Sequence, residues 1–159
     1  LMLQILRVRT ITDEGQPVER FGHDGAVGIE VCVAVRELSS RTFLRLYILD
    51  ENLDILLATH DFEFDEAIFT SRRPGSYIYH IQLPQKLLAP GSYRISLYAI
   101  QRSYRWEKVI DAVEHVCPFD VVDNGSVLAR VGIKWQGHIA VPVKWDIVDL
   151  HPIDARTGT

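Results

Sequence analysis

The stretch from Leu87 to Tyr98 constrains the fold more than any other part of the chain. It reads Leu-Leu-Ala-Pro-Gly-Ser-Tyr-Arg-Ile-Ser-Leu-Tyr. Pro90 presets its own φ and Gly91 can adopt φ > 0, so the pair predicts a sharp turn. The residues after the turn alternate in character, which predicts a β-strand with one face in the core. The core face would hold Tyr93, Ile95, Leu97 and Ala99, and the reverse face Arg94, Ser96, Tyr98 and Ile100.

Tyr93 stands at the start of this strand, directly after the turn. In sandwich folds of the immunoglobulin type, a tyrosine at such a corner donates a hydrogen bond from its hydroxyl to upstream backbone. We expect Tyr93 to play that role. Antibody domains carry a disulfide cysteine two residues later, but this chain has Ile95 there, so packing must replace the cross-link.

Two further stretches show the same period of two. Val27, Ile29, Val31, Val33 and Val35 alternate with smaller or polar residues, and β-branched side chains favour strand over helix. Thr42–Asp50 places Leu44, Leu46 and Ile48 inward and Phe43, Arg45, Tyr47 and Leu49 on the reverse face. A turn at 50–54 leads into a strand over 55–60.

Turn signals separate many short strands in this chain, and no long helical period occurs. We therefore predict an all-β, immunoglobulin-like antiparallel β-sandwich of about seven to nine strands. Residues 1–150 would form it, and 151–159 would be a C-terminal tail. We expect a turn at 21–25, a loop or edge strand at 61–69 and a long connection over 101–114. Residues 139–145 could add an edge strand, because Pro142 excludes a central one.

Composition and missing motifs exclude several functions. The net charge of −4 argues against a nucleic-acid partner, which needs a basic face. No apolar run is long enough to cross a membrane. The chain has no P-loop, no nucleophile elbow and no zinc-ligand spacing among its histidines and two cysteines. We predict no metal, no cofactor and no catalytic residue; Cys32 and Cys117 would be buried free thiols.

One enzymatic alternative remains open at the sequence level. Asp61, Glu63, Asp65 and Glu66 form the densest acidic group, and paired carboxylates hydrolyse glycosidic bonds. An acidic loop is more commonly a solvated one, so we expect a protein that is not an enzyme.

The reverse face of the two central strands carries tyrosines and arginines. In immunoglobulin-like order these strands are neighbours, so their outward side chains would share a surface. Aromatic rings stack under the apolar faces of sugars, while arginine and hydroxyl groups bind sugar hydroxyls. The candidate glycan-binding residues are Arg45, Tyr47, Arg94, Ser96, Tyr98 and Trp106, the last in a loop with Arg102, Tyr104 and Arg105. The alternative is an ordinary exposed face, on which Tyr and Arg are common.

Several motifs occur together in an order typical of one family. They are an opening Ile/Leu-x-Val strand, Leu-Asp-Glu-Asn-Leu-Asp-Ile-Leu at 49–56, Leu-Leu-Ala-Pro-Gly-Ser-Tyr at 87–93, Phe119-Asp120-Val121 and Val-x-x-x-Trp at 141–145. From Ile5 to Trp145 the chain resembles the C-terminal domain of Wzt, the ATP-binding subunit of ABC transporters that export O-antigen polysaccharide.

The resemblance implies a non-catalytic domain that binds the terminus of an O-antigen polysaccharide and gives the exporter its specificity. It also implies a homodimer, in which the last strand is sometimes exchanged, and a transmembrane subunit as partner of the full-length protein. The location would be cytoplasmic, at the inner face of the inner membrane, with the nucleotide-binding part upstream of residue 1. The alternative function is a structural β-sandwich that mediates subunit assembly. No family motif assigns the sugar-binding positions, so the candidate residues depend on face geometry alone.

Overall fold

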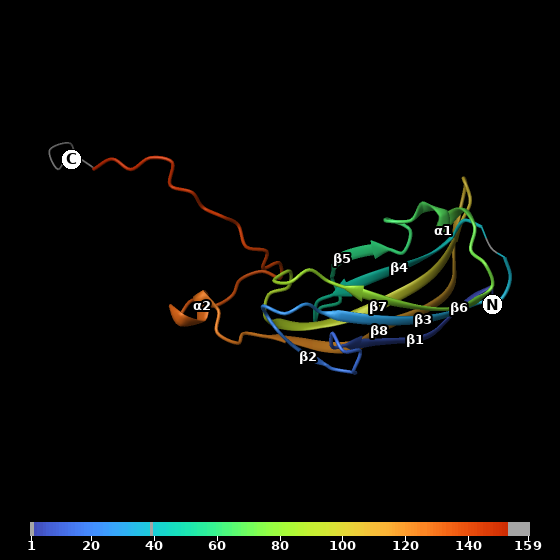
Figure 1. Cartoon of the computed structure of the whole chain (residues 1–159), viewed down its shortest axis with the longest axis horizontal. Helices are drawn as coiled ribbons and strands as arrows, with labels where there is room; N and C mark the ends of the chain where they lie inside the picture. The colour runs from blue at the N-terminus through green and yellow to red at the C-terminus, as the bar shows by residue number, and fades with distance from the viewer. Residues whose placement is uncertain (1, 39, 153–159) are drawn as a thin grey trace.

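Two β-sheets pack face to face in the computed structural model, which describes residues 2–38 and 40–152 (Figure 1). A three-stranded sheet has the order β1-β3-β6, and a five-stranded sheet has the order β2-β8-β7-β4-β5. The strands are β1 (Leu3–Ile11), β2 (Arg20–Gly22), β3 (Gly28–Val35), β4 (Thr42–Leu49), β5 (Ile55–His60), β6 (Gly75–Gln82), β7 (Gly91–Arg102) and β8 (Glu107–Val122). The prediction of an all-β sandwich is confirmed, and the eight described strands lie within the predicted range.

The core lies between the sheets and is formed by the residues that the alternation predicted. Val31 and Val33 of β3 belong to one core cluster with Leu46 and Ile48 of β4, and all four are almost completely buried. Ile95, Leu97 and Ala99 of β7 complete this layer. The period of two therefore assigned the inward face correctly on each of these strands. Cys32 and Cys117 are free thiols and only partly buried.

The corner before β7 has the predicted construction. Tyr93 is 1% exposed and donates a hydrogen bond from its hydroxyl to the carbonyl oxygen of Ala89. Its ring stacks on Phe119 of β8, with 5.5 Å between ring centroids. Burial raises the pKa of the Tyr93 phenol to about 12, so the hydroxyl stays protonated and can donate.

Of two expectations about the connections, one is confirmed in part and the other is wrong. The turn expected at 21–25 is confirmed over residues 22–25, where a 3.1 Å hydrogen bond from Gly25 N to the carbonyl oxygen of Gly22 closes it. The first two residues of the expected turn, Phe21 and Gly22, also belong to β2, which pairs in parallel with residues 120–122 of β8. The expected long connection over 101–114 is instead a hairpin with the short loop 103–106, closed by a 2.8 Å hydrogen bond from Ser103 N to the carbonyl oxygen of Trp106. Residues 107–114 belong to β8, but their polar composition hides this from a hydrophobic pattern.

β8 is long and irregular. Its pairing with β7 shifts register at several points, and His115 and Cys117 adopt φ of 55° and 52°. Such β-bulges add residues on one strand and redirect the side chains that follow. They therefore decide which parts of β7 and β8 reach the outer surface.

The two ends of the sandwich are covered differently. Between β5 and β6 the chain forms a loop with the short helix α1 (Glu66–Thr70), which agrees with the loop expected at 61–69. After β8 comes the short helix α2 (Val127–Arg130). The edge strand expected at 139–145 is wrong: Ile139 makes an isolated bridge to Leu88, and the chain then leads away from the sandwich (Figure 1). The predicted domain end at residue 150 stays a prediction, and residues 153–159 of the predicted tail lie outside the described residues.

The corner gives a direct test of how much one buried hydrogen bond stabilises the sandwich. Tyr93→Phe keeps the packing on Phe119 and removes only the hydroxyl, so the Ala89 carbonyl stays buried without its donor. We expect the free energy of unfolding to fall by about 1–3 kcal/mol, measured by urea denaturation. Tyr104→Phe is the matched control, because Tyr104 is 93% exposed; an equal loss in both variants would contradict the role of the corner.

Candidate functional site

The outer face of the five-stranded sheet brings the central candidate residues together. β4 and β7 are antiparallel neighbours, with Arg45 opposite Tyr98 and Tyr47 opposite Ser96. The rings of Tyr47 and Tyr98 meet edge to face, with centroids 5.5 Å apart. The predicted neighbourhood of the two strands is confirmed, and both tyrosines are partly exposed on this face.

Hydrogen bonds hold the polar ends of these residues in place. The Tyr98 hydroxyl donates to Glu114 Oε1 of β8 at 2.7 Å. Partial burial, together with the Glu114 carboxylate, raises the pKa of the Tyr98 phenol. Arg45 donates from Nη1 to Glu107 Oε1 at 2.9 Å and from Nε to His60 Nε2 at 3.1 Å. The face is therefore an ordered network in which ring edges and guanidinium groups have set orientations.

The other three candidates do not join this centre, because one is covered and two lie farther away. Ser96 is 1% exposed, and its hydroxyl oxygen accepts a hydrogen bond from the backbone N–H of His115 at 2.9 Å, so we do not include it among the proposed contacts. Arg94 is exposed near the opposite end of the face, where it pairs with Leu49. Trp106 is 51% exposed on the β7–β8 hairpin.

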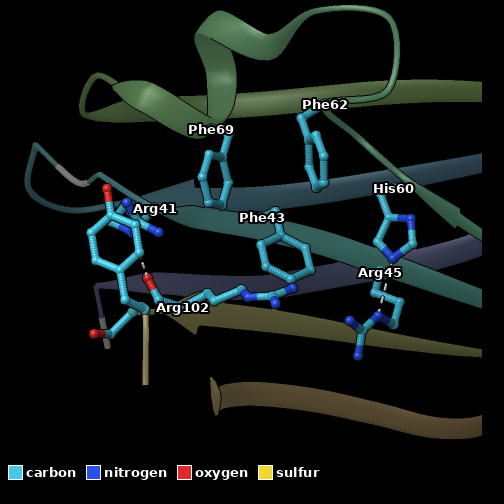
Figure 2. A pocket seen from close by; sticks show the side chains of 9 residues that line it. Arg41, Phe43, Arg45, His60, Phe62, Phe69 and Arg102 are labelled. Carbon is cyan, nitrogen blue, oxygen red and sulfur yellow. Dashed lines mark hydrogen bonds between the residues drawn. The ribbon is translucent and has the colours of Figure 1, made fainter. Parts of the chain in front are cut away.

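A pocket of about 580 Å³ opens at the end of this face that lies under α1. Figure 2 shows Phe62 and Phe69 descending from the segment around α1, with Phe43 opposite them. Arg41 lies at one end, His60 and Arg45 lie at the other, and the Arg102 side chain extends from the Arg41 end beneath Phe43. The lining residues are Arg41, Phe43, Arg45, His60, Phe62, Phe69, Arg102, Ser103 and Tyr104. The pocket thus combines an aromatic wall with arginines on two sides.

The aromatic residues of the wall contact each other. Phe43 of β4 is 2% exposed and lies beneath Phe62 and Phe69, at centroid distances of 5.3 Å and 6.0 Å. Phe62 and Phe69 are 5.3 Å apart. Of the lining residues, only Arg45 was among the candidate binding residues. The aromatic residues within the acidic segment 61–69 were the available signal for the missed wall.

A buried ion pair anchors the segment that carries this wall. The Arg72 side chain is 1% exposed, and its Nη2 lies 2.6 Å from Asp61 Oδ2. Arg72 also donates to the hydroxyl of Tyr79 on β6 and to the carbonyl oxygen of Thr42 on β4. The Asp61 carboxylate in turn accepts from the backbone N–H of Leu44. Both ends of the segment 61–72 are therefore fastened to the sheets.

The described residues show neither a metal-binding cluster nor a membrane-spanning helix. No group of three or more His, Cys, Asp or Glu side chains within them could hold a metal ion. Neither of the two described helices is long and apolar enough to cross a membrane. The arrangement on the outer face can stack rings and donate hydrogen bonds, which is binding chemistry.

The fold and this face define an immunoglobulin-like β-sandwich with an aromatic and arginine-rich outer surface. Among solved structures, the chain is similar to one described as the crystal structure of the C-terminal domain of Wzt, with a TM-score of 0.72. The match covers 92% of this chain and 84% of that one at 13% sequence identity. The resemblance inferred from sequence motifs is thus confirmed at the level of fold. No protein-family profile matches the chain, and no curated protein matches it.

The buried ion pair that anchors the segment 61–72 predicts a large effect on stability that depends on the partner residue. Arg72→Met leaves the Asp61 carboxylate buried without its cation, so we expect the free energy of unfolding to fall by about 3–5 kcal/mol, measured by urea denaturation. Adding Asp61→Asn to the same chain should recover part of the loss, because the unpaired charge is then removed. The neighbouring exposed Arg73→Met is the control and should change stability by no more than about 0.5 kcal/mol. Equal effects at positions 72 and 73 would contradict the anchoring role.

Proposed function

We propose that this chain is a non-catalytic glycan-recognition domain that binds the terminus of an O-antigen polysaccharide. In that role it would give substrate specificity to an ABC exporter, as part of an ATP-binding subunit that docks on a transmembrane partner. The location would then be cytoplasmic, at the inner face of the inner membrane. The observation that carries the proposal is the Tyr47–Tyr98 pair on the outer face, with Arg45 beside it and the pocket at its end.

The physical support comes from what sugars require of a binding surface. A pyranose ring presents apolar C–H groups on its faces and hydroxyls around its edge, so it binds where aromatic surface and hydrogen-bonding groups alternate. Tyr47 and Tyr98 supply rings that are partly exposed, and Arg45 and Arg94 supply donors. The similarity in fold to the C-terminal domain of Wzt adds support from an independent direction.

Titration with the O-polysaccharide of the source strain tests this proposal. Amide signals of Arg45, Tyr47 and Tyr98 should shift in NMR spectra, and Tyr98→Ala should weaken binding about three- to tenfold through the loss of ring stacking. Ile78→Ala is the control, because Ile78 is 65% exposed on the other sheet. Shifts confined to other surfaces, or unchanged affinity in Tyr98→Ala, would contradict the location. A cleaved product, detected by mass spectrometry, would contradict a non-catalytic role.

A second function, subunit assembly, is favoured by the segment after Ile139. Its apolar side chains are between 50% and 96% exposed and alternate over much of its length with Lys144, Asp146 and Asp149. These exposed side chains are Val141, Val143, Trp145, Ile147, Val148 and Leu150. Such a pattern is typical of a half-buried strand, and an unpaired one of this length favours a partner chain. We propose that the partner is a second copy, giving a homodimer, with or without strand exchange.

Sedimentation measurements test the homodimer. The unaltered chain should sediment as a dimer, and the variant Trp145→Ser/Ile147→Ser should shift toward the monomer because it removes two large apolar side chains. Lys144→Ser should leave the dimer unchanged. A monomeric parent chain would contradict the homodimer, and a Tyr98→Ala variant that changes assembly while keeping glycan affinity would favour the face as the assembly surface instead.

A further inference from the structure

We propose that the pocket bounded by Arg41, Phe43 and Arg102 binds an anionic substituent, a phosphate or a carboxylate, carried by a sugar ring. This inference deepens the proposed function and rests on it only for the sugar part of the ligand. The anion part follows from the charges around the pocket.

The pocket is positive within an acidic chain. Three arginines line it and none of the Asp or Glu residues that the structure describes does, although the chain carries a net charge of −4. Among the residues that the structure describes, Glu107 is the carboxylate paired with these arginines. Three arginines and one glutamate leave an excess of positive charge at this end of the sheet, and this positive charge attracts an anion.

Arg41 is held in place by two aromatic rings and a backbone hydrogen bond, and it has no acidic partner in the described part of the chain. Its Nε donates to the carbonyl oxygen of Arg102 at 2.9 Å. Its guanidinium carbon lies 4.3 Å from the ring centre of Tyr104 and 5.5 Å from that of Phe69. No carboxylate of the described residues lies within ion-pair distance of Arg41. Ring stacking and one backbone hydrogen bond therefore orient the Arg41 guanidinium, and no described carboxylate neutralises its charge. A planar, positively charged donor of this kind is suited to bind phosphate or carboxylate oxygens.

Arg102 and Arg45 share one carboxylate unequally. Glu107 Oε1 lies 2.9 Å from Arg45 Nη1, whereas its Oε2 lies 4.0 Å from Arg102 Nη1. The Arg102 side chain is 58% exposed, so it is only weakly engaged and can turn to a ligand. Glu107 therefore competes with an incoming anion for these two arginines, and it acts as a specificity-determining residue that lowers affinity for weakly charged ligands.

The aromatic wall explains why the anion would be attached to a ring. Phe62 and Phe69 are partly exposed above Phe43, and they offer apolar surface a short distance from the arginines (Figure 2). A free inorganic ion would leave this surface uncovered. A sugar that carries the anion could place its C–H face against the phenylalanines and its charge against Arg41 and Arg102.

Binding of four probes, three sugars and one inorganic ion, tests the inference. Glucose 6-phosphate, glucuronate and glucose differ mainly in charge, and inorganic phosphate lacks the ring. We expect amide shifts of Arg41, Phe43 and Arg102 with both charged sugars, weaker shifts with inorganic phosphate, and the weakest with glucose. The ratio of the dissociation constants of glucose 6-phosphate and glucuronate identifies which anion the pocket prefers. Glucose binding as tightly as both charged sugars would overturn the proposal.

Three variants separate the anion site from general electrostatics. Arg41→Gln and Arg102→Gln should each weaken binding of the preferred charged sugar about five- to tenfold, since each removes charge-assisted hydrogen bonds. Glu107→Gln should lower the dissociation constant of the same sugar about threefold or more. A loss of folding could not produce such a gain in affinity. Arg36→Gln is the control, because Arg36 is exposed after β3, next to Gln4. Equal losses in all arginine variants, or weaker binding in Glu107→Gln, would overturn the proposal.

The outcome for the glycan function is measured separately. If charged sugars shift the pocket residues while the O-polysaccharide leaves Tyr47 and Tyr98 unchanged, the anion site stands and the glycan proposal fails. If the O-polysaccharide shifts the tyrosines while no charged sugar shifts Arg41, the anion proposal fails alone.

Discussion

The buried ion pair between Arg72 and Asp61 is the constraint on which the functional end of this sandwich depends. It reaches both sheets, through Tyr79 on β6 and the backbone of β4. A buried charge that loses its partner is costly, so the segment between the two residues is held closely against the sheets. The aromatic wall of the pocket therefore exists before any ligand arrives, and binding need not supply the free energy to order that segment.

Hydrophobic alternation predicted the core, and side-chain chemistry predicted the corner. Val31 and Leu46 were assigned to the interior because a strand has a period of two, and Tyr93 because a turn followed by an inward tyrosine has a known geometry. The first half of β8 was missed because its pairing with β7 depends on register shifts and bulges, not on an apolar face. β2 was missed because three residues are too few to show a period.

The candidate site could be predicted only as far as strand order determined it. Adjacent strands place Tyr47 beside Tyr98, so sheet topology was sufficient for this pair. Ser96 shares their face, yet the bulge at His115 covers its hydroxyl, and a bulge leaves no clear mark in the sequence. The phenylalanines of the wall come from a connecting segment whose position follows from tertiary contacts, which no local pattern contains.

Much of the pocket is built from connections outside the two sheets. The β7–β8 loop contributes Ser103 and Tyr104, the approach to β4 contributes Arg41, and the segment around α1 contributes Phe62 and Phe69. Loops tolerate substitution and changes in length far better than the packed strands that carry them. Ligand preference could thus diverge among proteins of this architecture while the interior stays the same. When strands form the fold and loops form the binding pocket, low sequence identity between proteins that share the fold is the expected outcome.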